Sequence, residues 1–169
     1  MGISRRRVLL GGAAAGTGLG AIAASAVVVE FGIPAEGSLV LTARELAVVR
    51  ALAEVMFPRG PFPVDGLEAG VAEEVDRLLA EVLDPIHASG FRTLLHTLEW
   101  GTLASRGATF SSLSAADRAE VLQIWADPTV FTRRIAGDAF KVILGMAFFG
   151  HPAVLQRIGW SLGCQGGAT

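Results

Sequence analysis

Apolar residues recur at helical spacing along most of the chain, and no segment alternates convincingly in the manner of a strand. The stretch LTARELAVVRALAEVMFP, residues 41–58, carries leucine and valine at three-residue steps. Thr42, with Glu45 three residues later, forms a capping box, which marks the start of a helix. The pattern therefore predicts a first helix that begins after Thr42 and ends before Pro58.

Four further helices and a short helical turn follow by the same reasoning. The segment PRGPFPVDG, residues 58–66, is too rich in proline and glycine to continue a helix, so it is predicted to be a loop of defined shape. The predicted helices run from Leu67 to about Leu83, from the N-cap Asp84 to about Leu103, from Ser114 to just before Pro128, and from Thr129 to Pro152, with a short turn around Val154 to Trp160. The predicted fold class is all-α: a compact bundle of about five to six helices with a Gly-rich C-terminal tail.

The first segment has a different pattern, because three arginines are followed by 22 uncharged residues, Val8 to Val29. This run is long enough to cross a bilayer, although 12 of its residues are Gly or Ala. Within it, GTGLGA has the spacing of a dinucleotide loop, but no βαβ unit surrounds it. The third reading is an export signal, with a basic region, an apolar region and a small-residue cleavage site ending at Ala26.

The string SRRRVLL, residues 4–10, resembles the twin-arginine export signal S/T-R-R-x-F-L-K. Arg5 and Arg6 are the paired arginines, and Leu9 stands at the leucine of that motif. An ordinary signal or an uncleaved anchor is the alternative. We therefore predict a twin-arginine signal helix over residues 1–26, a linker over 27–41 and a helical domain over 42–169. That route carries proteins that have already folded, so the location expected is the periplasm or the outer face of the cytoplasmic membrane.

Composition narrows the classes of partner and site. Removing residues 1–26 takes away three of the 14 basic residues and none of the 16 acidic ones, which leaves a formal charge of −5 and argues against a nucleic-acid partner. Cys164 is the one cysteine of the chain, so it can form no disulfide within it. It is a candidate for a disulfide with another chain, or a free thiol.

The search for catalytic chemistry gives no strong candidate. His96 lies three residues before Glu99, but one such pair is no metal site, and we expect a surface or capping role for His96. The adjacent Glu73 and Glu74 point about 100° apart on a helix and cannot act as an acid/base pair. The chain has neither a G-x-S-x-G elbow nor a Walker loop. We therefore expect no catalytic, cofactor-binding or metal-binding residue in this chain.

The end of the chain is unusually apolar. Met146, Phe148, Phe149, Ile158 and Trp160 exceed what one amphipathic face can bury if the last long helix is only half covered. Each aromatic taken singly is more typical of a core. The segment as a whole favours a surface that meets a partner.

Five stretches together resemble the small (gamma, or third) subunit of gluconate 2-dehydrogenase and related flavin-dependent sugar dehydrogenases. They are SRRRVLL, LTARELAVVRALAEVMFP, GLEAGVAEEVDRLL, FSSLSAADRAEVL and GMAFFGHPAVLQRIGW. The tail of that family commonly has an aromatic pair, a polar-Pro step and a Gly-aromatic step. These correspond here to Phe148-Phe149, His151-Pro152 and Gly159-Trp160, with phenylalanine and tryptophan where tyrosine is common.

The resemblance implies an accessory role. Such a subunit binds a catalytic subunit of the glucose/methanol/choline type, which carries FAD and lacks its own signal. It aids the folding of that subunit and takes it across the membrane through the twin-arginine translocon. A cytochrome c subunit is a further partner that the resemblance suggests. The candidate partner contacts are then Phe148, Phe149, His151, Pro152 and Trp160. Two other hypotheses stay open, a membrane-tethered helical structural protein and an independent metal-binding enzyme that uses His96 and Glu99.

Overall fold

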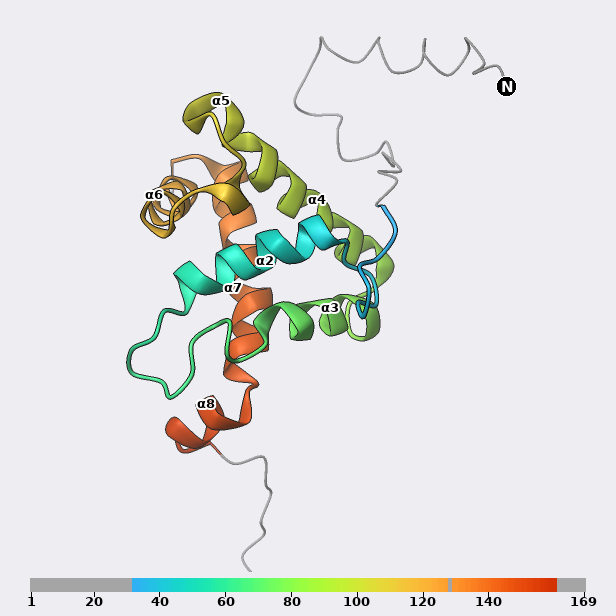
Figure 1. The fold of residues 1–169 in the computed structure, drawn as a ribbon, viewed down its shortest axis with the longest axis vertical. Helices are drawn as coiled ribbons and strands as arrows, with labels where there is room; N and C mark the ends of the chain where they lie inside the picture. The colour runs from blue at the N-terminus through green and yellow to red at the C-terminus, as the bar shows by residue number, and fades with distance from the viewer. Residues whose placement is uncertain (1–31, 128, 161–169) are drawn as a thin grey trace, which may run out of the picture. The chain divides into compact units, whose positions relative to one another are not determined.

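The protein is described by a computed structural model that covers residues 32–127 and 129–160 (Figure 1). Within these residues every regular element is a helix, which confirms the all-α prediction. The elements are α2 (Ala43–Met56), α3 (Val71–Glu81), α4 (Pro85–Gly101), α5 (Leu103–Arg106), the 3-10 turn η1 (Phe110–Ser112), α6 (Ala115–Trp125), α7 (Phe131–Phe149) and α8 (Pro152–Arg157).

Helix α2 packs against α3, α4, α6 and η1, and α7 packs against α3 and α6. In Figure 1 the long α7 passes behind α2, and α8 follows at its C-terminal end. The core between the helices is built from large apolar side chains. Its most deeply buried members include Leu41, Leu52, Leu95, Leu98, Phe110, Phe140, Leu144 and Phe148.

Three helices begin at the residues that the capping signals indicate. The Thr42 hydroxyl accepts a hydrogen bond from the amide of Glu45 (3.3 Å), while the Glu45 carboxylate accepts one from the amide of Thr42 (2.8 Å), so the capping box is confirmed. Asp84 caps α4 and Ser114 caps α6 through their side-chain oxygens. Local side-chain chemistry therefore sets these starts.

Helix α3 begins four residues later than the apolar pattern predicts. The Asp65 carboxylate accepts hydrogen bonds from the amides of Leu67 and Glu68 (3.0 and 2.9 Å), which holds residues 65–68 in a separate turn. Gly70 then takes a left-handed conformation, with φ at 63°, before the helix starts at Val71. A residue other than glycine would be strained there.

The loop over residues 58–66 is a defined structure, as predicted. Its last residue, Gly66, passes so close to α2 that a Cβ atom would lie 2.4 Å from the Ala53 carbonyl oxygen. The Gly66 amide donates to the Phe57 carbonyl (2.9 Å), which closes the loop at its base. Glycine is therefore required at position 66 for the loop to return to the core.

Glu45 is 1% exposed and joins α2 to α4. Its carboxylate accepts two hydrogen bonds from the Arg92 guanidinium (2.9 and 3.0 Å), and the His96 ring lies 3.2 Å from one of its oxygens. Burial by itself would raise the pKa of Glu45. The hydrogen bonds from Arg92 and Thr42 outweigh burial and hold the pKa below its usual value.

Asp76 is 4% exposed and holds the chain that leads into α2. Its two carboxylate oxygens accept hydrogen bonds from three consecutive amides, those of Leu39 (2.5 Å), Val40 (3.0 Å) and Leu41 (2.7 Å). The side chain of Leu41 is fully buried beside it. The end of the predicted linker is therefore packed against α3.

Replacing Asp76 by asparagine should lower the free energy of unfolding by about 2 kcal/mol. The neutral amide loses charge-assisted hydrogen bonds, and its NH2 group can face a backbone donor. Urea unfolding followed by circular dichroism measures this difference. Glu81→Gln is the matched control, because Glu81 is an exposed carboxylate of α3 and should change stability by less than about 0.5 kcal/mol. Equal losses for both variants would contradict the anchoring role of Asp76.

Replacing Glu45 by glutamine should cost about 3 kcal/mol near neutral pH, because Arg92 then keeps a buried charge without its carboxylate. The folded-state pKa of Glu45 is depressed, so its stabilisation is complete above the unfolded pKa of about 4.3 and is lost as the pH falls through the lower folded value. The stability gap between the wild type and Glu45→Gln should therefore narrow on acidification. Urea unfolding curves between neutral and strongly acidic pH test this, and a gap that stays constant would contradict it.

Candidate docking surface

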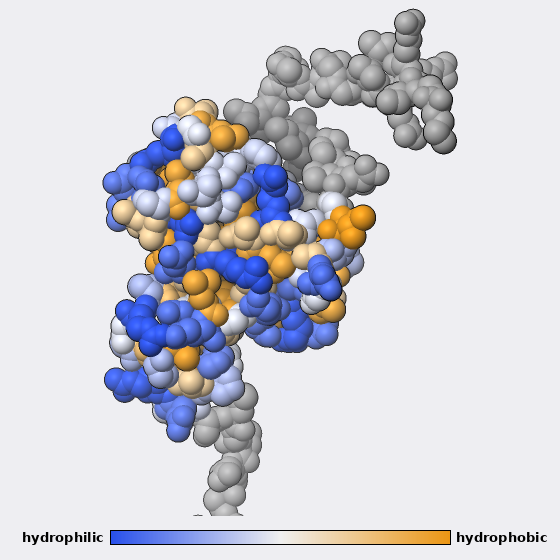
Figure 2. All heavy atoms as spheres, viewed as in Figure 1, coloured by the Kyte–Doolittle hydropathy of each residue, from blue (hydrophilic) through white to orange (hydrophobic). Residues whose placement is uncertain are grey.

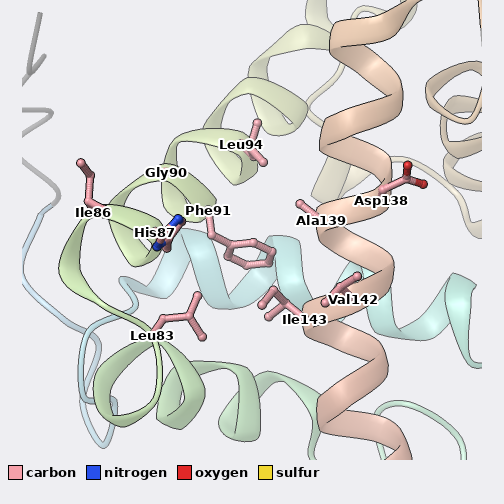
Figure 3. Close-up of a pocket in the computed structure, with 10 residues that line it drawn as sticks. All are labelled: Leu83, Ile86, His87, Gly90, Phe91, Leu94, Asp138, Ala139, Val142 and Ile143. Carbon is pink, nitrogen blue, oxygen red and sulfur yellow. The ribbon is translucent and has the colours of Figure 1, made fainter. Parts of the chain in front are cut away.

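A groove of about 440 Å³ opens between α4 and α7 (Figure 3). Side chains from both helices and from the turn between α3 and α4 form its walls, and most of them are apolar. The lining residues are Leu83, Ile86, His87, Gly90, Phe91, Leu94, Asp138, Ala139, Val142 and Ile143. A concave, apolar surface of this kind is typical of a binding site.

The groove exists because small residues occupy its walls. Gly90 has no side chain on α4 and has no heavy atom within 4 Å of an added Cβ, and Ala139 offers only a methyl group from α7. Below them, the Phe91 ring packs edge-on against Phe140, with centroids 5.7 Å apart, and closes the floor. The depression is therefore a surface feature above a packed core.

Charged residues stand at the edges of the groove. His87 pairs with Asp84 at the start of α4, and this hydrogen bond, together with the helix amides that Asp84 caps, holds the pKa of Asp84 below its usual value. On the other wall, Asp138 lies 3.3 Å from Lys141 and 3.8 Å from Arg134. Both edges are polar, while the space between them is apolar.

A second apolar region lies where α7 ends, and here the structure corrects one expectation. Phe148 is 1% exposed, so it is a core residue and has no surface for a partner to contact. Its ring stacks on Phe57, with centroids 4.3 Å apart and planes 8° apart, and meets Phe62 edge-on at 5.4 Å. The loop over residues 58–66 therefore covers Phe148.

The other candidates at this end lie at the surface. Phe149 is 44% exposed and Trp160 is 57% exposed, and Pro152 is the exposed first residue of α8. His151 caps α8, because its ring nitrogen Nδ1 accepts a hydrogen bond from the amide of Ala153 (3.3 Å). These four residues are accessible to a partner, and their contact with one stays a prediction.

His96 and Glu99, the two residues considered as a possible metal-binding pair, make structural contacts within the helical domain. His96 lies beside Glu45, and Glu99 points elsewhere, with its carboxylate accepting hydrogen bonds from the amide (2.9 Å) and the hydroxyl (2.7 Å) of Ser111. The structure does not bring His96 and Glu99 together as a pair. Sequence reasoning missed the Asp84–His87 pair, although its three-residue spacing was a readable signal.

Several sequence predictions concern parts of the chain outside the described residues: Arg5, Arg6, Leu9 and Cys164 all fall there.

Among the described residues, no group of three or more His, Cys, Asp or Glu side chains could hold a metal ion. None of the helices in this same part is long and apolar enough to span a bilayer. Figure 2 shows hydrophilic and apolar residues interleaved over the face that carries α2 and α3.

The match to a known family decides the identity of the chain. The family model of gluconate 2-dehydrogenase subunit 3 matches residues 43–166. The chain belongs to the gluconate 2-dehydrogenase subunit 3 family. The matched range includes every helix from α2 to α8, and therefore both walls of the groove and the aromatic end of α7. Comparisons with curated proteins and with solved structures gave no match.

Neighbouring phenylalanines at the end of α7 should respond differently to truncation. Phe148→Ala should lower the free energy of unfolding by about 3–4 kcal/mol, because it empties a site between two rings. Phe149→Ala, the matched control on the next residue, should cost clearly less, about 1–2 kcal/mol, because almost half of that side chain is already in water although its ring meets Phe57 and Phe62 edge-on. Urea unfolding measures both, and similar losses would contradict the assignment of Phe148 to the core.

Proposed function

We propose that this chain is the non-catalytic small subunit of a flavin-dependent dehydrogenase that oxidises a sugar, a polyol or gluconate. The observation that carries the proposal is the family match, which covers the whole described helical region from α2 onward. The family name supports a dehydrogenase as the catalytic partner subunit. Its FAD is bound by that partner, and a cytochrome c subunit accepts the electrons.

The use of the buried carboxylates supports a non-catalytic role. Glu45 accepts hydrogen bonds from Arg92 and Thr42, Asp76 from three backbone amides, and Glu99 from Ser111. A general acid or base must be free to exchange a proton with a substrate. Carboxylates saturated in this way hold helices together instead.

The exposed apolar surfaces support a binding role. The groove between α4 and α7, with Phe149 and Trp160 at the far end of α7, gives the chain more exposed large apolar groups than its own folding requires. Burial of these groups against a larger subunit would stabilise both chains. We therefore assign them to contact with the catalytic subunit.

The first segment supplies the export function in this proposal. The SRRRVLL string directs the folded complex to the twin-arginine translocon, and the catalytic subunit crosses the membrane with this chain. The complex then works in the periplasm or on the outer face of the cytoplasmic membrane. A chain that folds with its partner before export explains why an export signal for folded proteins is useful.

The test is a pull-down of the tagged chain from fractionated cells that make the complex. The wild type should bring down a larger, flavin-absorbing protein from the periplasmic or membrane fraction. The double variant Arg5→Lys/Arg6→Lys should leave both chains, still bound to each other, in the cytoplasm, because the paired arginines are what the translocon reads. Arg7→Lys is the matched control and should be exported like the wild type.

Recovery of this chain alone and without flavin absorption would contradict the accessory-subunit function. Normal export of the flavoprotein with the double variant would contradict the export role and leave the subunit assignment intact. The two parts of the proposal therefore fail separately.

A further inference from the structure

Charge is distributed unevenly along the described chain. Residues 32–127 carry seven arginines and 14 acidic residues, a formal charge of −7. Residues 129–160 carry four cations against one carboxylate, a formal charge of +3. These five residues are Arg133, Arg134, Asp138, Lys141 and Arg157. The segment that forms α7 and α8 is therefore basic, in a domain that is otherwise acidic.

The acidic helices do not neutralise the positive charge of α7. Within residues 32–127, six of the seven arginines form ion pairs with carboxylates of that same part, as Arg50 does with Glu73 (2.7 Å). In α7, Arg134 and Lys141 share one carboxylate, that of Asp138, at 3.8 and 3.3 Å. Among the described residues, no other carboxylate lies within 4 Å of either cation. This group of three side chains therefore keeps a net positive charge.

The other two cations of this segment make weak or uncharged contacts. Arg157 donates a hydrogen bond to the Pro61 carbonyl (3.2 Å), which carries no charge. Hydrogen bonds from Thr129 hold the pKa of Asp127 below its usual value, and the charge of Arg133 adds to this effect. Asp127 is exposed, so water screens its attraction to Arg133. The basic character of α7 and α8 therefore persists at the surface.

The cations border the exposed apolar row of α7. Ile135 and Val142 are 51% and 58% exposed. Arg134 and Lys141 each precede one of them and are likewise seven residues apart, so they lie two turns apart along one edge of the helix. We name these two cations the basic edge. On the other side of the row, Ala139 lines the groove toward α4 (Figure 3).

We propose that the catalytic subunit contacts α7 through an apolar patch whose rim carries carboxylates opposite the basic edge. This inference rests on the proposed function and adds the chemistry of the partner surface. Protein interfaces combine an apolar centre with a polar rim, and opposite charges across the rim speed encounter and fix orientation. A row of exposed apolar side chains beside unneutralised cations is one half of such an arrangement.

A second copy of this chain fits the same surface less well. Two copies related by a two-fold axis at α7 would bring two basic segments together, each with a formal charge of +3, and like charges across an interface cost free energy. A copy that presented its acidic side would form a head-to-tail contact, which leaves the next α7 uncovered unless a ring closes. A different chain with an acidic rim meets neither constraint.

Binding of the purified flavoprotein to the immobilised full chain tests the basic edge. Arg134→Gln/Lys141→Gln should raise the dissociation constant about tenfold at low salt, because two rim pairs are lost, and the difference should shrink as NaCl is added. Arg50→Gln/Arg77→Gln is the matched control. It changes the net charge equally at exposed arginines of α2 and α3, and it should change the dissociation constant less than about twofold.

Asp138→Asn should act in the opposite direction. The Asp138 carboxylate competes with the partner for Arg134 and Lys141, so its neutralisation should lower the dissociation constant about threefold at low salt. Damage to the fold would weaken binding instead, and circular dichroism of each variant checks the helices. Weaker binding by a folded Asp138→Asn chain would contradict an acidic rim on the partner.

The possible failures are distinguishable. Flavoprotein binding that Arg134→Gln/Lys141→Gln leaves unchanged, or weakens no more than the control does, would overturn this inference and leave the accessory-subunit function intact. A wild-type chain that captures no flavoprotein would contradict the proposed function itself. Binding to phosphatidylglycerol vesicles that this double variant loses, with flavoprotein capture unchanged, would assign the basic edge to the membrane surface and refute the acidic protein rim.

Discussion

The buried carboxylate of Glu45 is the constraint on which the arrangement of helices depends. It closes the first turn of α2 through Thr42 and binds Arg92 of α4 at the same time. A carboxylate placed out of water is tolerated only when charge and hydrogen bonds compensate it. The start of α2 and the middle of α4 therefore cannot move independently. Because α4 is one wall of the groove, the geometry of the candidate docking surface is tied to a polar interaction in the interior.

Buried polar side chains and exposed apolar side chains lie in different parts of the molecule. Buried acidic groups are saturated by partners within the chain: Glu45 by Arg92, Asp76 by backbone amides and Glu99 by Ser111. Large apolar groups, in contrast, are left in water along α7 and beside α4. A family of dehydrogenase subunits needs this division if its members bind other chains and leave the chemistry to them. Stability comes from internal polar anchors and a core, and in the proposed function the exposed apolar surface supplies the contact with another chain.

Local signals in the sequence predicted the helices well, because a capping residue and the amides it binds lie within three positions of each other. Thr42, Asp84 and Ser114 could therefore be recognised directly. Phe148 could not be separated from Phe149, since both rings contact Phe57 and Phe62, which lie more than 80 positions earlier, and only the packed structure shows that Phe148 is the buried ring. The role of Asp76 and the groove could not be predicted from the sequence for the same reason. The residues that contact Asp76, and those that line the groove, come together only after the helices have packed.

The three hydrogen bonds from residues 39–41 to Asp76 have a mechanical consequence. They fasten the chain to α3 just ahead of the first helix, with Leu41 buried next to them. Tension applied to the chain before Gly32 reaches this fastening before it reaches α2. The bonds share a single carboxylate, so they resist together and fail together. The force that a pull on the N-terminal side must exceed before it acts on the helical domain is therefore set by these three hydrogen bonds. Because all three are made to Asp76, a substitution of that one residue would change this force.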